Sequence, residues 1–328
     1  MSAQLIPVTV LTGFLGAGKT TLLNRILKSE HGRKIAVIEN EFGPEGIDNE
    51  LLVQDADEQI VEMNNGCICC TVRGDLMRIL ADLAAKRAAG KLDFERVIIE
   101  TTGMANPGPV TQTFFMDDNV ADHYLLDGVV TVVDAKHGAQ TLDEQSEAQA
   151  QVGFADRILL SKTDLVDAAE ADALRRRLIA MNPRAHIKPV AFGETDISDV
   201  LDIRGFNLNA ILDLDPEFLA GEHPHSHDGD IAAFAFNSER PFDPARLDEF
   251  LGGIVQVYGP DLLRYKGVLY MHGTNRRVIF QGVHMLMGSD VGKAWEKGET
   301  RFSRIVFIGR NLPREVILKG LEQCLVQH

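Results

Sequence analysis

The sequence predicts an α/β fold in which a mostly parallel sheet flanked by helices is followed by a smaller C-terminal α+β domain. Three observations support this prediction. Short, nearly continuous apolar runs alternate with helical patterns from the N-terminus to about residue 192. A glycine-rich loop joins the first of these runs to the first helical pattern. From about residue 230 the order changes to a strand, a helix, three strands and a last helix, which is typical of a small sheet covered on one face by two helices.

The glycine-rich loop at residues 13–20 reads GFLGAGKT and matches the pattern G-x-x-x-x-G-K-T. It follows the β-branched run at 6–11 and precedes helix-spaced Leu and Ile at 21–28. Backbone N–H groups of such a loop surround polyphosphate oxygens, and the helix N-terminus adds partial positive charge. The residues predicted to hold the nucleotide are Gly13, Gly16, Ala17, Gly18, Lys19, Thr20 and Thr21. Since the Thr20 hydroxyl can ligate Mg²⁺, the sequence predicts a P-loop NTPase.

The remaining apolar runs predict a parallel sheet that is covered on both faces. The expected strands are residues 34–38, 96–99, 128–133 and 157–160, and the expected helices between and after them are 73–89, 141–152 and 167–180. Continuous apolar runs are typical of parallel strands, and the helices allow right-handed crossovers. Ligands of such sheets bind at the carboxyl ends of the strands.

Composition excludes some classes of function. The chain has 33 basic and 48 acidic residues, and its formal net charge of −15 argues against nucleic-acid binding and favours cations. No apolar run approaches the roughly 18 residues of a membrane span, and the N-terminus does not resemble a secretory leader. We therefore expect a cytoplasmic protein without membrane or nucleic-acid partners.

Two polar segments follow predicted strands. Glu100 is placed to reach the Mg²⁺ shell through water, and Gly103 is placed to offer an amide to a terminal phosphate. A strand-end Glu can also cap a helix, but the upstream phosphate loop favours the catalytic interpretation, with Lys19 and Thr20 as its partners. Residues 161–164 read SKTD and are similar to the base-recognition element of guanine-specific proteins. The nucleotide prediction therefore includes Ser161, Lys162 and Asp164, with Ser161 holding the loop or base less firmly than the commoner Asn.

A cysteine cluster indicates metal chemistry. Cys67, Cys69 and Cys70 lie within residues 66–70, and the crowding does not resemble a disulfide framework. Thiolates next to a helix N-terminus favour Zn²⁺ or Cu(I) over Mg²⁺. Three adjacent sulfurs cannot surround one tetrahedral ion without strain, so Glu39 and Glu41, after a neighbouring strand, are natural further ligands. A buried, inert thiol group explains three cysteines less well.

The segment from 216 to 230 is predicted to be a linker. His223, His225 and His227 alternate there and face one way in an extended chain, so they form a weak secondary site for Zn²⁺ or Ni²⁺ or belong to a bland, flexible junction. Cys324 lies among leucines of the last helical pattern, which favours a packed thiol.

The ordered motifs at 13–20, 39–43, 66–70, 100–103 and 161–164 resemble the CobW family of P-loop GTPases, related to the urease and hydrogenase nickel-insertion GTPases, and most closely its YjiA-type subgroup. The resemblance covers the whole chain, including Leu263 to Gly267 of a C-terminal domain. It implies a GTPase that handles zinc or another transition metal, with a metal site shared between the acidic residues and the cysteines. Pro44 departs from the family pattern, because close relatives commonly have an acid there, and Glu45 follows instead.

These observations predict a GTPase domain at 1–215, the linker at 216–230 and a C-terminal domain at 231–328. The predicted function is slow GTP hydrolysis with Mg²⁺, coupled to insertion of zinc, or of Co²⁺ or Ni²⁺, into a client metalloprotein. The sequence is compatible with a homodimer and does not predict the oligomeric state. Three alternatives remain: a zinc buffer or sensor that delivers no metal, a P-loop kinase for a small molecule, and a client-assembly GTPase that metal only regulates.

Overall fold

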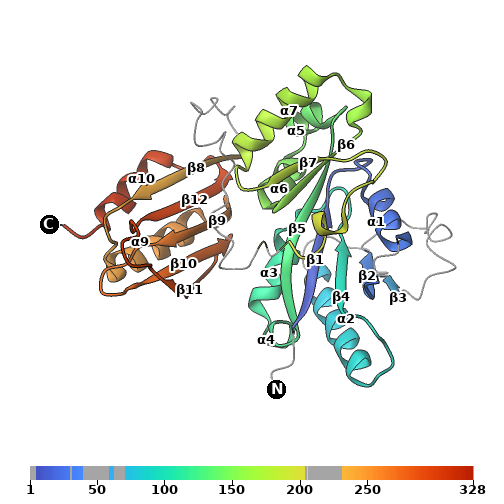
Figure 1. Ribbon diagram of the computed structural model, residues 1–328, viewed down its shortest axis with the longest axis horizontal. Coiled ribbons are helices and arrows are strands. Elements are labelled where there is room, and N and C mark those ends of the chain that lie inside the picture. Colours follow the sequence, from blue (N-terminus) through green and yellow to red (C-terminus); the bar gives the residue numbers. More distant parts are fainter. Residues whose placement is uncertain are drawn as a thin grey trace. The chain divides into compact units, whose positions relative to one another are not determined.

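The computed structural model describes residues 5–29, 32–39, 59–62, 71–203, 205 and 231–327. They fall into two compact units, which are treated separately below. The N-terminal unit holds a parallel sheet flanked by helices and the C-terminal unit holds an antiparallel sheet with two helices (Figure 1). Both parts of the predicted fold class are confirmed. Among the described residues no helix has the length and hydropathy that a membrane crossing needs.

The N-terminal sheet has seven strands in the order β3-β2-β4-β1-β5-β6-β7, and every neighbouring pair is parallel. The strands are β1 (Ile6–Thr12), β2 (Ile35–Glu39), β3 (Gln59–Glu62), β4 (Arg96–Glu100), β5 (Tyr124–Asp134), β6 (Arg157–Ser161) and β7 (His186–Pro189). β1 lies at the centre, so loop 13–20 leaves the sheet at its middle. The sequence patterns predicted five of these strands and missed β3 and β7.

In the described part of the chain, eight helical segments connect these strands. They are α1 (Lys19–Lys28), α2 (Thr71–Ala88), α3 (Gly108–Met116), α4 (Asp118–Ala121), α5 (Gly138–Glu144), α6 (Ser146–Phe154), α7 (Ala168–Met181) and the 3-10 turn η1 (Thr163–Leu165). A further 3-10 turn, η2 (Ile197–Asp199), follows β7. The prediction of one helix at 141–152 is wrong, because the backbone is extended at Gln145 (φ −126°) and divides α5 from α6.

Alternate residues of β5 show how the two faces of this sheet are covered. Val130 and Val132 pack in one core with α1 residues such as Leu23. Thr131 points to the other face, where its hydroxyl donates to the Gln151 carbonyl of α6 at 2.8 Å. Burial on both faces explains the continuous apolar runs.

The C-terminal unit is an antiparallel sheet in the order β11-β10-β9-β12-β8. Its elements are β8 (Ile231–Ser238), α9 (Pro244–Tyr258), β9 (Leu262–Leu269), β10 (Arg276–Val283), β11 (Leu286–Ala294), β12 (Ser303–Arg310) and α10 (Arg314–Gln323). The sequence predicts three strands between the two helices of this unit, but the structure has four, because the chain turns at His284 (φ 51°) and pairs β10 with β11 in a hairpin.

Both helices cover the same face of this sheet, as predicted. The Asp243 carboxylate caps α9 by accepting from the Arg246 amide at 3.0 Å, and Pro244 occupies its first turn. Leu251 of α9 and Leu321 of α10 share a core with Phe307 of β12. Cys324 is buried in the same core, so the predicted packed thiol is confirmed.

Candidate functional site

Loop 13–20 owes its shape to glycines. Gly16 and Gly18 have φ of 72° and 103°, a left-handed region that residues with a side chain rarely adopt. Gly18 is also the N-cap of α1, so the backbone turns directly from the loop into the helix. Thr20 and Thr21 are exposed in the first turn of α1, where unpaired N–H groups and the helix dipole favour anions.

Two other glycines mark places where backbones meet. A Cβ at Gly13 would lie 2.3 Å from the Val132 carbonyl oxygen of β5, so only glycine fits there. A Cβ at Gly103 would lie 2.7 Å from the Leu15 nitrogen. The segment after β4 therefore lies directly against the phosphate loop, and a movement of either one affects the other.

Lys19 is a buried cation at the start of α1. Its side chain is folded back so that Nζ donates to the Gly13 carbonyl at 2.9 Å, and the residue is 9% exposed. Burial lowers the pKa of Lys19 below its ordinary value, and the charge of Glu100 offsets part of this effect. A buried ammonium group with incomplete compensation is suited to an anionic ligand.

Thr20 and Glu100 come together from distant parts of the chain. The Thr20 hydroxyl donates to Glu100 Oε1 at 3.1 Å. Glu39 ends β2 in register with Glu100 of β4, and both carboxylates are buried. The Thr20 hydroxyl and the Glu100 carboxylate are hard oxygen donors of the kind that Mg²⁺ prefers, so this pair fits a magnesium ion.

The base-recognition segment is joined to the phosphate loop. The Ser161 hydroxyl donates to the Ala17 carbonyl at 2.7 Å and lies 3.3 Å from the Val133 carbonyl. Lys162 has a left-handed backbone (φ 56°), and its Nζ contacts Asp134 Oδ2 at 2.7 Å. Asp164 lies exposed in η1. Serine at 161 therefore contacts the loop through its hydroxyl.

Asp134 is a site residue that the sequence analysis did not predict. Burial alone would raise the pKa of this carboxylate, but hydrogen bonds from Lys162, from the His137 ring and from the amides of Lys136 and His137 lower it. The group is thus an anion that fixes the Lys162 side chain. Its place directly after the predicted strand 128–133, at the edge where ligands bind, was the signal available in the sequence.

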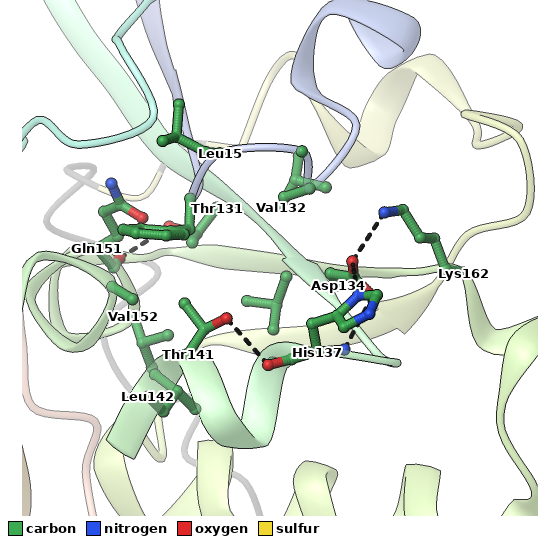
Figure 2. A pocket seen from close by; sticks show the side chains of 16 residues that line it. Leu15, Thr131, Val132, Asp134, His137, Thr141, Leu142, Gln151, Val152 and Lys162 are labelled. Atoms are coloured by element: carbon green, nitrogen blue, oxygen red, sulfur yellow. Dashed lines mark hydrogen bonds and ion pairs between the residues drawn. The ribbon is translucent and has the colours of Figure 1, made fainter. Parts of the chain in front are cut away.

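A cavity of about 240 Å³ lies beside the phosphate loop (Figure 2). Loop 13–20, the end of β5, and helices α5 and α6 line it. Asp134, His137 and Lys162 form one polar end (Figure 2). At the other end the Gln151 amide donates to the carbonyls of Gly103 and Ala105, both at 3.0 Å. Gln151, also missed by the sequence analysis, ties α6 to the segment that contacts the phosphate loop.

The predicted transition-metal ligands are only partly within the described residues. Glu39 is placed as stated above, whereas Glu41, Cys67, Cys69 and Cys70 lie outside the described residues, as do His223, His225 and His227. Within the described ranges no group of three or more His, Cys, Asp and Glu side chains is arranged to hold a metal ion. Lys19, Thr20 and Ser161, which are predicted to bind nucleotide, contact the phosphate loop or Glu100, and the assembly of the thiol site remains a prediction.

Two known family domains match most of the chain. Residues 7–189 match the CobW/HypB/UreG nucleotide-binding domain, and residues 231–325 match the cobalamin synthesis protein cobW C-terminal domain. The two matches correspond to the parallel and the antiparallel sheet.

Individual relatives match over nearly their full length. The zinc chaperone YjiA of Escherichia coli (strain K12) is 42% identical over 317 residues, which are 95% of this chain and 96% of the relative. The zinc chaperone CobW of Pseudomonas aeruginosa is 34% identical over 359 residues, covering 98% of this chain and 92% of the relative. The crystal structure of the Zn(II)-bound YjiA GTPase from E. coli superimposes with a TM-score of 0.80 at 37% identity, covering 98% and 100% of the two chains.

Proposed function

Because this chain belongs to the CobW family of nucleotide-binding proteins, we propose that it is a GTPase that couples GTP binding and hydrolysis to the delivery of zinc to a client metalloprotein. The observation that carries the proposal is the meeting of Lys19, Thr20, Glu100 and Gly103 at the middle of the parallel sheet. A zinc chaperone 42% identical to the chain and a zinc-bound GTPase of the same fold support it.

In the proposed reaction, loop 13–20 holds the phosphates. Backbone N–H groups from Gly13 to Thr21 surround the phosphate oxygens, and Lys19 leaves the Gly13 carbonyl to reach the terminal phosphates. Thr20 and Glu100 would hold Mg²⁺, which when bound neutralises charge on the phosphates. Because Gly103 lies against Leu15, the segment after β4 is placed to respond to the third phosphate.

Guanine is the proposed base. Asp164 accepts hydrogen bonds from the base, while Ser161 fixes the segment to the phosphate loop and Lys162 is anchored by Asp134. Adenine presents an acceptor at the ring nitrogen where guanine presents a donor, so it would leave the Asp164 carboxylate unpaired. Hydrolysis without a partner is expected to be slow, as in switch GTPases that lack an arginine finger in place.

Zinc is the proposed cargo, which the protein binds and then delivers. Glu39, Glu41, Cys67, Cys69 and Cys70 are the proposed ligands, and His223, His225 and His227 are a weak secondary site. Glu39 pairs in register with Glu100, so one edge of the sheet carries a proposed zinc ligand beside a proposed magnesium ligand. A ligand shared with a nucleotide-responsive segment makes zinc affinity depend on nucleotide state, and linkage requires the reverse effect to be equal.

The domain assignment is part of the same proposal. The GTPase domain is taken as 1–215, the linker as 216–230 and the C-terminal domain as 231–328. The C-terminal domain is proposed to dock the client or to read the nucleotide state.

The decisive experiment measures Zn²⁺ affinity of the full chain without nucleotide, with GDP and with a non-hydrolysable GTP analogue, using a fluorescent zinc chelator as competitor. We expect the GTP-analogue and GDP forms to differ by at least fivefold, and Cys67→Ser, Cys69→Ser and Cys70→Ser to abolish tight binding. Co²⁺ and Ni²⁺ titrations test metal preference. Equal zinc affinities in all three states would refute the coupling.

The alternatives predict different results. A small-molecule kinase transfers phosphate to an acceptor, so release of GDP and inorganic phosphate in equal amounts without acceptor excludes it. For a zinc buffer, Lys19→Ala leaves the rate of zinc transfer to the chelator unchanged with GTP present, whereas the coupled switch requires that rate to change. A GTPase that metal only regulates changes its turnover with zinc but transfers none.

A further inference from the structure

The segment that follows β7 lies beside the base-recognition segment. β7 pairs with β6 in parallel, and the Val190 amide donates to the Leu160 carbonyl at 2.8 Å, so residues 191–194 leave the sheet at the same edge as 161–164. A Cβ at Gly193 would lie 3.3 Å from the Cα of Leu22. The segment therefore also touches the first turn of α1, where the nucleotide phosphates are proposed to bind.

Residues 191–194 form a tight turn with an unfavourable residue. The Glu194 amide donates to the Ala191 carbonyl at 2.8 Å, and the central residues Phe192 and Gly193 have φ of 51° and 74°. A turn with positive φ at both central positions favours Asn-Gly, because Asn and Gly tolerate the left-handed region and bulky residues do not. Phenylalanine is thus unfavourable for the left-handed backbone conformation that position 192 adopts.

Packing does not explain this residue. Phe192 is 74% exposed, more than any other large apolar residue in the described part of the chain. The sequence therefore places an aromatic ring where the turn disfavours it and where the protein core gains little from it. Strained positions that persist without a packing reason are concentrated at functional sites.

We propose that Phe192 stacks on the purine base of the bound nucleotide and supplies most of the apolar contact to that base. This inference rests on the proposed nucleotide binding and adds a residue to it. Stacking on an aromatic ring is favourable for every base. Phe192 therefore contributes affinity, whereas Asp164 contributes the choice of guanine.

The test uses two substitutions at this position in the full chain. Phe192→Asn removes the ring and fits the turn, so we expect an equal or higher melting temperature without nucleotide and a GDP affinity reduced roughly 5- to 150-fold. Phe192→Tyr keeps the ring and restores GDP affinity to within about threefold of the unchanged protein. Inorganic tripolyphosphate, which has no base, binds equally to all three proteins.

A second exposed ring serves as the control. Phe115 is 43% exposed in α3, and Phe115→Ala leaves GDP affinity unchanged. The inference is overturned if Phe192→Asn binds GDP within twofold of the unchanged protein. An equal loss of GDP and tripolyphosphate affinity also overturns it, since the residue would then act on the loop and not on the base. If the unchanged protein binds no GDP, the proposed function is overturned, and so is the inference that rests on it.

Discussion

The two sheets of this chain bury different kinds of side chain: polar groups at one edge of the parallel sheet, and aromatic rings on one face of the antiparallel sheet. Along the carboxyl edge of the parallel sheet, Lys19, Glu39, Glu100 and Ser161 are each 9% exposed or less. The helix-covered face of the antiparallel sheet instead buries aromatic rings. The buried cations of this sheet lie on its opposite face. Burying a polar group costs stability unless it is compensated. The concentration of such groups at one edge therefore indicates a ligand site, and the aromatic face indicates a packed core.

This difference separates stability from activity in experiments. The chain has a single tryptophan, Trp295, which is 4% exposed in the C-terminal unit. Its fluorescence reports unfolding of that unit, while GTP hydrolysis reports the N-terminal unit. A substitution in one unit is therefore expected to change one of these two signals and to leave the other unchanged.

The largest effect is expected for Phe307→Ala. Phe307 is fully buried and packs against Phe234 and Tyr265 at ring-centroid distances of 5.4 and 6.3 Å. Removing the ring leaves a cavity and costs about 3–5 kcal/mol of unfolding free energy. Urea unfolding followed by Trp295 fluorescence measures this loss, and GTP turnover per folded molecule stays unchanged below the transition. A proportional loss of turnover under folded conditions would show that the antiparallel core takes part in hydrolysis.

The next largest effect is expected for Lys19→Ala. Loss of a buried ammonium group that stabilises developing phosphate charge lowers kcat/KM for GTP by about 10²- to 10³-fold. The unfolding midpoint reported by Trp295 is unchanged. Lys28→Ala is the matched control, because Lys28 lies exposed at the other end of the same helix and its loss leaves turnover intact. Turnover in Lys19→Ala within tenfold of the unchanged protein contradicts the proposed site.

The two sheets were not equally visible in the sequence. Strands buried on both faces, such as β2 and β4, carry continuous apolar runs and were predicted. β7 reads HIKP and has no fully buried residue, so no apolar pattern distinguished it. β11 carries glycines at 288 and 292 and alternates weakly, so the prediction missed this strand.

The site was predictable only where the residues lie in one short motif. Lys19 and Thr20 follow from the loop pattern, because chemistry and spacing are fixed together. Gln151 contacts Gly103 across 48 positions of sequence, and nothing in the local pattern of α6 indicates that contact. The break at Gln145 was equally hidden, since neither glycine nor proline marks it.

A smaller effect is expected for Gln151→Leu, which tests whether α6 holds the segment after β4. The substitution removes the N–H donors to the carbonyls of Gly103 and Ala105, and a buried carbonyl left unsatisfied, such as that of Gly103, costs about 1–3 kcal/mol. We expect the ratio of affinities for a GTP analogue and GDP to fall by roughly tenfold, a shift of about 1.4 kcal/mol.

Gln149→Leu is the matched control for this prediction. Gln149 is also buried in α6, but its amide donates to the Leu142 carbonyl of α5 at 2.8 Å. It is expected to lower stability while keeping the ratio of the two nucleotide affinities. Equal changes of that ratio in both variants would mean that general loosening of α6, and not the bonds to Gly103 and Ala105, is responsible.

The smallest effect is a pH dependence in the C-terminal unit. Burial lowers the pKa of His284 below its ordinary value, although hydrogen bonds to the carbonyls of Gly259 and Pro260 and the charge of Asp261 oppose this shift. The unfolded chain therefore binds the proton more readily than the folded chain. The contribution of His284 to stability is full above the unfolded pKa near 6.5 and is lost as pH falls through the lowered folded value.

His284→Asn isolates this contribution, because Asn tolerates the left-handed backbone at this position (φ 51°) and does not titrate. Urea unfolding followed by Trp295 fluorescence from pH 8 to pH 5 should show the unchanged protein losing more stability on acidification than the variant. Since the proposed nucleotide residues are in the other unit, the difference between the two proteins is expected in the fluorescence signal and not in GTP affinity. Parallel pH curves for the two proteins would contradict the lowered pKa of His284.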